Sequence, residues 1–253
     1  MRRYYEGHEA VYQRLEAAGA DCWGGADFEQ VHMLGFLRDA LVRTGLQERS
    51  QAEVLVLGCG TGPLACVLRR HGFRVSAVDI SPTAIKLARQ QAEKRGLTIH
   101  YRVGDVCRDP LGDRQYDLIV DSHCLHCIVP EADRRQALAS IRRALRKDGF
   151  FVLETMMGQV RSDHVSTDEA GIVWNAHGDQ EPDFEPRVLR DGQWFVPQRR
   201  LRPSKAALDD ELRAAGFQIT WCDTAASPQE TGVSDYRAIC QVAPGMDNHP
   251  NAG

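Results

Sequence analysis

The stretch EVLVLGCGTGP, residues 53–63, joins a short apolar run to three glycines at alternating positions. A run compatible with a helix follows, from Pro63 to Leu68. This order predicts a buried strand, a tight turn and a helix start. Glycine lets a turn approach a ligand closely, and the first turn of a helix offers unpaired N–H groups. The stretch therefore predicts a ligand site at a strand-to-helix turn.

The composition is that of an ordinary globular protein. The 253 residues are 43% apolar and 26% charged, with a formal net charge of -4. This balance argues against a nucleic-acid partner, because nucleic-acid-binding domains carry a basic surface. No apolar run reaches the ~20 residues of a membrane span, and no secretory signal follows Arg3. The eight cysteines are scattered, so we expect a cytoplasmic protein with reduced thiols and no membrane partner.

The first fifty residues predict a helical cover ahead of the strands. One helix is expected over residues 6–18, and a second over 28–43, where apolar residues recur at three- and four-residue steps. The simplest role for this cover is packing on the sheet. The aromatic side chains of Tyr4, Tyr5 and Trp23 could instead cover a ligand.

From residue 53 onward, strands and helices alternate. Strands are predicted at 53–57, 74–78, 98–103, 117–120 and 150–155, with serine N-caps at Ser81 and Ser204. Such alternation indicates a mainly parallel sheet, whose strands end at one edge where ligands bind. The residues expected at that edge are Gly58–Gly62, Asp79, Asp105, Asp121–Cys127 and Glu154–Met157.

Residues 156–203 interrupt the alternation. They are rich in Gly, Asp, Pro and Arg, and an insertion of this length predicts a lid or a small subdomain. A helix and two strands, 217–222 and 235–242, resume the pattern. We expect one domain over 1–243 and a disordered tail over 244–253.

Two kinds of nucleotide site are possible at the glycine loop. The dinucleotide fingerprint G-x-G-x-x-G needs its third glycine at Pro63, whereas the spacing here is G-x-G-x-G. Asp79 follows at the end of the next strand, where a carboxylate can accept both hydroxyls of a ribose. The pattern favours a nucleoside ligand over NAD.

Five motifs in the expected order resemble those of the class I S-adenosylmethionine-dependent methyltransferases. They are residues 53–62, Asp79 with Ser81-Pro82, Gly104-Asp105-Val106, Tyr116–Val120 and Leu145–Gly149. The resemblance covers 51–155 well and 204–242 in layout. It implies an α/β fold, a Rossmann-like three-layer sandwich. Its seven-stranded sheet would be mostly parallel, with the last strand antiparallel between the fifth and the sixth.

The resemblance also implies the cofactor, S-adenosyl-L-methionine, and the residues that bind it. Asp79 would bind the ribose hydroxyls, Asp105 would accept from the adenine amino group, and Asp121 would lie near the sulfonium and methionyl end. The full set of implied cofactor residues is Gly58, Cys59, Gly60, Gly62, Asp79, Ile80, Asp105, Val106 and Asp121.

The segment DSHCLHC, residues 121–127, lies where the methyl acceptor is expected. His123 or His126 could be a general base, because imidazole titrates near neutral pH. The histidines could instead pack in the core, or join Asp121 and the cysteines around a transition metal. Cys124 and Cys127 could also form a redox pair. The base interpretation is favoured, and no residue is assigned as a metal ligand.

The sequence therefore predicts a methyltransferase that acts on oxygen, nitrogen or sulfur of a small polar or aromatic metabolite. Arginines of the insertion could hold an acceptor carboxylate, or form a solvated charged face. Three alternatives remain: a metal-assisted methyltransferase that uses the His123/His126/Cys cluster, a catalytically silent cofactor-binding protein, and a nicotinamide dehydrogenase. The oligomeric state is not predicted.

Overall fold

The computed structural model describes residues 2–22, 28, 30–111, 116–160, 165–227 and 230–245. Trp23, His164 and residues 246–253 of the expected tail lie outside this part of the chain. Within the described ranges, no helix is both long enough and apolar enough to cross a membrane.

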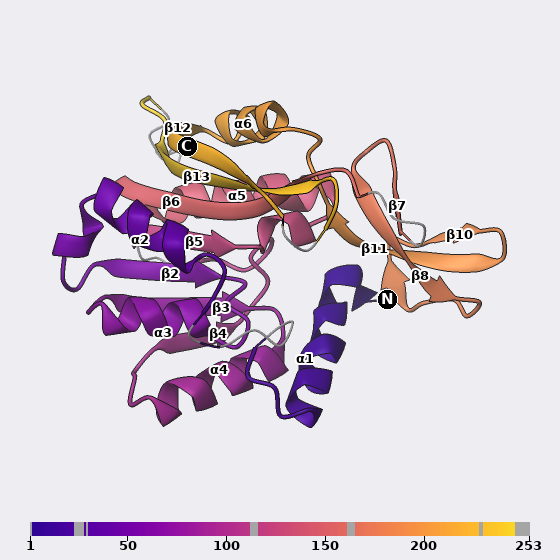
Figure 1. Ribbon diagram of the computed structural model, residues 1–253, viewed down its shortest axis with the longest axis horizontal. Coiled ribbons are helices and arrows are strands. Elements are labelled where there is room, and N and C mark those ends of the chain that lie inside the picture. Colours follow the sequence, from indigo (N-terminus) through magenta and orange to yellow (C-terminus); the bar gives the residue numbers. More distant parts are fainter. Residues whose placement is uncertain are drawn as a thin grey trace, which may run out of the picture.

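A seven-stranded sheet forms the centre of the molecule (Figure 1), in the order β12-β13-β6-β5-β2-β3-β4. All strands run in one direction except β13, which is antiparallel to both β6 and β12. The expected seven-stranded sheet with an antiparallel last strand is confirmed. The strands are β2 (Glu53–Leu57), β3 (Arg74–Asp79), β4 (His100–Val103), β5 (Tyr116–Ser122), β6 (Leu145–Gly158), β12 (Phe217–Ala226) and β13 (Val233–Val242).

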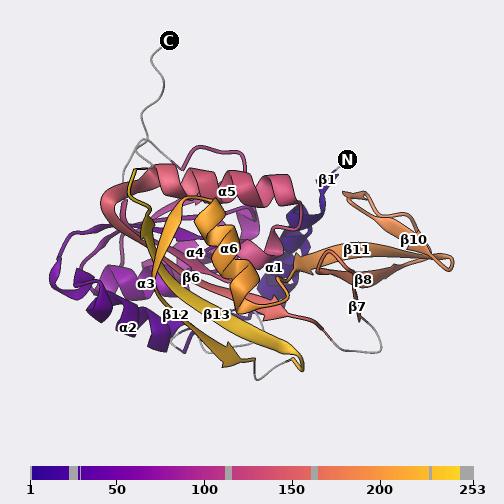
Figure 2. The same ribbon diagram turned by 90° about the horizontal axis from the view of Figure 1, so that it is seen from above.

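Helices cover both faces of this sheet (Figure 2). One apolar core packs α2 (Leu34–Arg43), α3 (Pro63–Arg70) and α4 (Pro82–Lys94) against one face. A second core packs α5 (Glu131–Ala144) and α6 (Lys205–Ala214) against the other. Strand β2 is buried on both sides, because Val54 and Val56 enter the first core while Leu55 and Leu57 enter the second. This alternation follows from the period of two along a strand.

Several element boundaries differ from those expected. The helix predicted to start at Phe28 starts at Leu34, although Phe28 and Met33 are both buried. Apolar periodicity reports which side chains are buried, and here buried residues continue into a non-helical turn. Strand β6 starts at Leu145, where the sequence predicts Phe150, because Leu145 already pairs with Tyr116 before a register shift.

The expected helix starts are confirmed at two serines. The hydroxyl of Ser81 accepts from the Ala84 N–H, and that of Ser204 accepts from the Ala207 N–H. Each satisfies one of the N–H groups that a helix leaves unpaired at its start.

The N-terminal segment lies beside the ends toward which β2 and β3 point (Figure 1). It consists of β1 (Arg2–Arg3), a 3-10 turn η1 (Tyr4–Gly7) and α1 (His8–Ala17). Glu9 of α1 accepts hydrogen bonds from Ser81 Oγ at 2.5 Å and from the Thr83 backbone N–H at 3.2 Å. Lys86 of α4 pairs with Glu16 at 2.6 Å. The segment is therefore joined to the start of α4 by polar contacts.

The insertion forms a second, smaller sheet with the order β10-β11-β8-β7, which projects beyond α1 (Figure 1). Its strands are β7 (Val165–Thr167), β8 (Ile172–Gly178), β10 (Val188–Arg190) and β11 (Gln193–Arg200). The short β9 (Phe184–Glu185) leaves this sheet and pairs in parallel with β1. The N-terminal segment and the insertion thus contact each other directly, through residues 2–3 and 184–185.

Candidate active site

The glycine loop connects β2 to α3 in a conformation that favours glycine. Gly58, Gly60 and Gly62 have φ of 53°, 54° and 87°, a region in which a side chain is strained. The space is also occupied: a Cβ on Gly58 would lie 2.8 Å from the Cβ of Cys124. The Cys59 N–H donates to the Val78 carbonyl at 3.0 Å, which joins the loop to β3.

Asp79 is the last residue of β3, and its side chain accepts a hydrogen bond from the glycine loop. Its Oδ2 accepts from the Gly60 N–H at 2.8 Å, and its Oδ1 accepts from the Ser81 N–H at 2.9 Å. Burial raises the pKa of this carboxyl. A carboxylate has about four lone-pair positions, so a ligand hydroxyl would use those that the backbone N–H groups of Gly60, Ile80 and Ser81 leave open. The next residue, Ile80, packs against the buried rings of Tyr4 and Tyr5.

Asp105 lies just past β4 and contacts the N-terminal segment. Its Oδ2 accepts from the Tyr5 hydroxyl at 2.9 Å, and its Oδ1 accepts from the Cys107 N–H at 2.8 Å. Val106 is partly buried against the core on the α5 face. Tyr4 and Tyr5 are buried, as simple packing predicts, yet Tyr5 also contacts the residue that the resemblance implies for adenine.

Asp121 holds the loop after β5 in place. It is buried, and its Oδ1 accepts from the Cys124 N–H at 2.9 Å. Burial raises the pKa of Asp121 to about 6. Because Cys124 also faces Gly58, this carboxyl holds the loop after β5 against the glycine loop. None of the eight cysteines, all of which lie in the described part of the chain, forms a disulfide, and this includes Cys124 and Cys127.

The two candidate bases differ in their surroundings. His126 is buried, and its Nδ1 accepts from the Met156 N–H at 3.3 Å. Burial lowers the pKa of His126 well below its ordinary value, which keeps the ring neutral. His123 is partly exposed and lies 3.4 Å from Asp235 Oδ1. Burial alone would lower the pKa of His123, but the Asp235 and Glu154 carboxylates outweigh it and raise the pKa.

Three further residues surround His123. His32 Nδ1 lies 3.2 Å from Glu154 Oε1, and His32 Nε2 lies 3.6 Å from Asp235 Oδ2. Glu154 is fully buried and also accepts from Arg237 Nε at 2.6 Å. The sequence indicates Glu154 through its place at the end of a strand. It gives no signal for His32 or Asp235, which reach this point only through the antiparallel path of β13 and the turn before α2.

The arginines of the insertion have partners within the protein. Arg187 pairs with Glu181 and Glu185, while Arg190 lies over the rings of Trp174 and Phe195. The other three join the insertion to α5, to α6 and to the loop before β13. Arg199 pairs with Glu230, Arg200 with Glu131, and Arg202 with Glu131 and Glu211. Their charges are therefore used in folding the insertion onto the protein.

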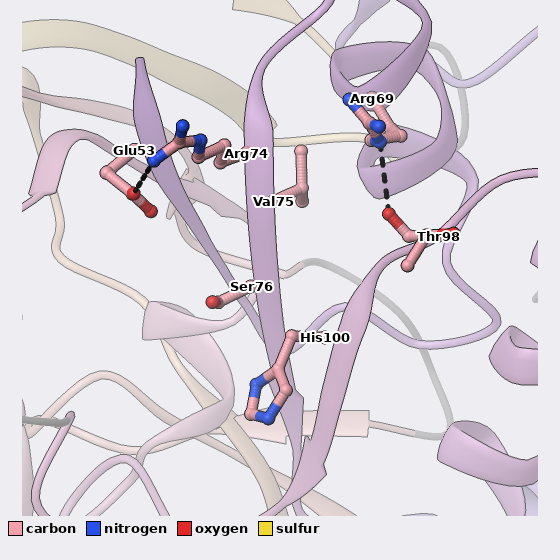
Figure 3. Close-up of a pocket in the computed structure, with 7 residues that line it drawn as sticks. All are labelled: Glu53, Arg69, Arg74, Val75, Ser76, Thr98 and His100. Atoms are coloured by element: carbon pink, nitrogen blue, oxygen red, sulfur yellow. Dashed lines mark hydrogen bonds and ion pairs between the residues drawn. The ribbon is translucent and has the colours of Figure 1, made fainter. Parts of the chain in front are cut away.

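A separate hollow of about 250 Å³ lies at the other edge of the sheet (Figure 3). It is lined by residues at the starts of β2, β3 and β4, among them Glu53, Arg74 and His100. None of the predicted site residues lines this hollow. They lie at or just past the carboxyl ends of strands, as the parallel topology predicts.

The sheet order and the loop define a Rossmann-like α/β protein, and comparison with known proteins shows which proteins it is similar to. Residues 55–153 match the family model of a methyltransferase domain. The malonyl-[acyl-carrier protein] O-methyltransferase of Serratia marcescens is 31% identical over 63% of this chain and 54% of that protein. A ubiquinone biosynthesis O-methyltransferase of Rickettsia prowazekii is 24% identical over 57% of this chain and 58% of that protein. The chain thus spans little more than half the length of either relative.

A solved structure matches over nearly the full chain. An S-adenosylmethionine-dependent methyltransferase from Clostridium acetobutylicum has a TM-score of 0.62 at 16% identity, with 94% of this chain and 99% of that chain covered. At this identity the likeness concerns the fold. Together with the domain match and the ordered motifs, it shows that residues 55–153 are similar to a methyltransferase domain and that the chain has the fold of the class I S-adenosylmethionine-dependent methyltransferases.

Proposed function

We propose that this protein transfers the methyl group of S-adenosylmethionine to an oxygen of a small polar or aromatic metabolite. The observation that carries the proposal is the contact of Asp79 with Gly60. It places a buried carboxylate under a loop of three glycines with positive φ. The names of the two O-methyltransferase relatives support oxygen as the atom methylated.

The residues around the loop fit this cofactor. The glycines let the loop backbone approach the methionine and ribose closely, and the remaining lone-pair capacity of Asp79 accepts from the ribose hydroxyls. Asp105 accepts from the adenine amino group after exchanging its bond with Tyr5, and Asp121 lies toward the methionyl end. S-adenosylmethionine supplies an activated methyl group, so the protein's contribution is orientation and exclusion of water.

His123 is the histidine that we propose contacts the acceptor. Its ring is partly exposed and lies beside two carboxylates, whereas the ring of His126 is buried and accepts from a backbone N–H. In this position His123 can take the proton from an acceptor hydroxyl. The N-terminal segment and the insertion cover the acceptor, a role supported by the pairing of β1 with β9.

Two measurements test the proposal. Calorimetry should detect stoichiometric binding of S-adenosylhomocysteine, and absence of binding by both cofactor forms would overturn the cofactor assignment. Incubation with S-adenosylmethionine and a panel of phenols, catechols and carboxylic acids should produce S-adenosylhomocysteine in an acceptor-dependent manner. Binding without turnover on any acceptor would instead favour the catalytically silent alternative.

A further inference from the structure

Four side chains from distant parts of the sequence converge beside the loop after β5. They are His32 before α2, His123 after β5, Glu154 in β6 and Asp235 in β13. Ligand atoms of His32, His123 and Glu154 all lie within 4.8 Å of one another. Asp235 Oδ1 lies 3.4 Å from His123 Nε2, and Asp235 Oδ2 lies 3.6 Å from His32 Nε2. We refer to these four residues as the His–carboxylate cluster.

Hydrogen bonding accounts poorly for the cluster. The contacts of 3.4, 3.6 and 3.7 Å between its imidazole nitrogens and carboxylate oxygens exceed the usual length of an N–H···O bond. Two of its atoms, His123 Nε2 and Asp235 Oδ1, are buried and have no hydrogen-bond partner in the described part of the chain. Buried polar atoms are normally paired, and an unpaired one calls for an explanation such as a missing ion. Asp235 is only 2% exposed and points at the gap between the rings.

The charges also call for a cation. Glu154 and Asp235 bring two carboxylates together, and Arg237 is the cation that donates to Glu154. With both imidazoles neutral, the cluster and Arg237 together carry one net negative charge. Imidazole nitrogens and carboxylate oxygens together suit divalent transition metals such as zinc.

We propose that the His–carboxylate cluster binds one divalent transition metal ion of the zinc class, with His32, His123 and Glu154 as ligands and with Asp235 beside His123. In a tetrahedral site with bonds of about 2.0–2.1 Å, neighbouring ligand atoms lie roughly 3.3 Å apart. Glu154 Oε1 lies 3.2 Å from His32 Nδ1 and 3.7 Å from His123 Nε2, and the ligand atoms of all three residues lie within 4.8 Å of one another, so small side-chain movements bring them to that spacing. Arg237 would orient Glu154 from behind, as outer groups do in metal sites.

The site differs from the metal alternative that the sequence leaves open. His126, Cys124 and Cys127 do not converge with His123 into a ligand group within the described residues. His123 is common to both sets. When the ion is bound, His123 cannot also accept a proton. Metal binding therefore competes with the base role proposed for His123, whereas cofactor binding involves none of the three ligands and can be measured separately.

Cobalt(II) is the probe, since it replaces zinc and reports its ligands by absorption in the visible range. The full chain, freed of metal by a chelator, is titrated with Co²⁺ at pH 8, and S-adenosylhomocysteine binding is measured on the same sample. We expect saturation at one Co²⁺ per chain, with a spectrum of nitrogen and oxygen ligands. His32→Ala should weaken Co²⁺ binding at least about 100-fold.

His32 is suited to this test because its side chain is 43% exposed, so its removal leaves the core packing intact. The matched control is His100→Ala, which lies in the hollow at the opposite edge and should leave Co²⁺ affinity unchanged. Glu154→Gln gives a second ligand variant. Three results would overturn the proposal: no saturable Co²⁺ binding, a thiolate-to-cobalt charge-transfer band, or equal affinity in wild type and His32→Ala. Any of them leaves the cofactor result standing.

Discussion

Gly62 meets two demands at once, one from its backbone and one from its neighbours. Its φ is 87°, and a Cβ there would lie 2.5 Å from the Tyr101 hydroxyl and 3.1 Å from the Ala88 Cβ. Gly72 has a similar φ of 94°, but a Cβ there would meet nothing within 4 Å. Comparing substitutions at Gly62 and Gly72 therefore separates the cost of backbone strain from the cost of steric overlap with neighbouring side chains.

We predict that Gly62→Ala destabilises the protein more than Gly72→Ala. The left-handed backbone costs roughly 1–2 kcal/mol in either variant, and overpacking adds roughly 1–3 kcal/mol only at Gly62. Urea unfolding followed by circular dichroism gives both free energies. Equal losses would show that Tyr101 moves aside without cost.

For Asp79→Asn, we predict weaker binding of S-adenosylhomocysteine by about 10- to 100-fold. An amide keeps the shape but loses the charge, and hydrogen bonds to charged groups contribute roughly 1.5–3 kcal/mol. Calorimetry measures the affinity. Asp210→Asn, at a carboxylate that is 79% exposed on α6, is the control and should bind as wild type does. An unchanged affinity in Asp79→Asn would remove the ribose assignment.

Single residues of the glycine loop could be predicted because their spacing along the chain is fixed by the turn itself. The contact between Gly60 and Asp79 follows from two adjacent parallel strands, which the alternating pattern already indicates. The His–carboxylate cluster could not be predicted. Its members lie up to 203 residues apart (235 − 32 = 203), and they meet only because β13 runs antiparallel beside β6.

At the scale of elements, a buried ion network joins α5, α6 and the end of the insertion. Arg134, which is 1% exposed, donates to both carboxylate oxygens of Glu211 at 2.7 Å. Arg202 donates to the same carboxylate at 2.8 and 3.0 Å. Burial alone would raise the pKa of Glu211, but these two guanidinium groups outweigh it and lower the pKa to about 2.

We predict that Glu211 makes the protein's stability depend on pH in the acid range. Its folded pKa of about 2 lies below the ordinary value of 4.5. Its contribution is therefore present above about pH 5 and is lost as the pH falls toward 2, and it amounts to at most about 3 kcal/mol. Urea unfolding of wild type and Glu211→Gln should differ most at neutral pH and progressively less between pH 5 and pH 3. A difference that stays constant with pH would contradict the assignment.

The helix boundaries show where prediction by element fails. The serine caps at residues 81 and 204 were predictable because capping is a local hydrogen bond. The start of α2 was not, because Phe28 and Met33 continue the apolar pattern into a turn. The strands of the small sheet, between residues 165 and 200, could not be predicted from the sequence. They are short and lack long alternating runs, and they pair with one another inside the insertion.

At the scale of the whole molecule, the proposed cofactor site lies at one edge of the sheet. The N-terminal segment and the insertion pair with each other through β1 and β9. Ligand binding at the cofactor site should stabilise the entire fold, because the loop, β3 and β5 all belong to the central sheet. We predict that S-adenosylhomocysteine at 100 times its dissociation constant adds about 2.7 kcal/mol. For a chain of this size that raises the melting temperature by about 5–10 °C.

NAD at the same concentration is the comparison for this thermal shift and should leave the melting temperature unchanged. The G-x-G-x-G spacing and Pro63 provide no third glycine for a dinucleotide turn. A shift with NAD and none with S-adenosylhomocysteine would favour the dehydrogenase alternative.

The arginine–tryptophan contacts of the insertion affect the fluorescence of the protein. Trp174 and Trp194 both lie in the small sheet, where guanidinium groups of Arg190 and Arg187 sit 5.5 and 5.7 Å from their ring centres. Trp221 lies instead on β12 of the central sheet, stacked on Phe36 of α2 at 5.4 Å. Indole fluorescence responds to such neighbours. The fourth tryptophan, Trp23, lies outside the described residues. Replacing Trp23 together with either group by phenylalanine would therefore give a protein whose emission follows the small sheet or the central sheet during unfolding and ligand binding.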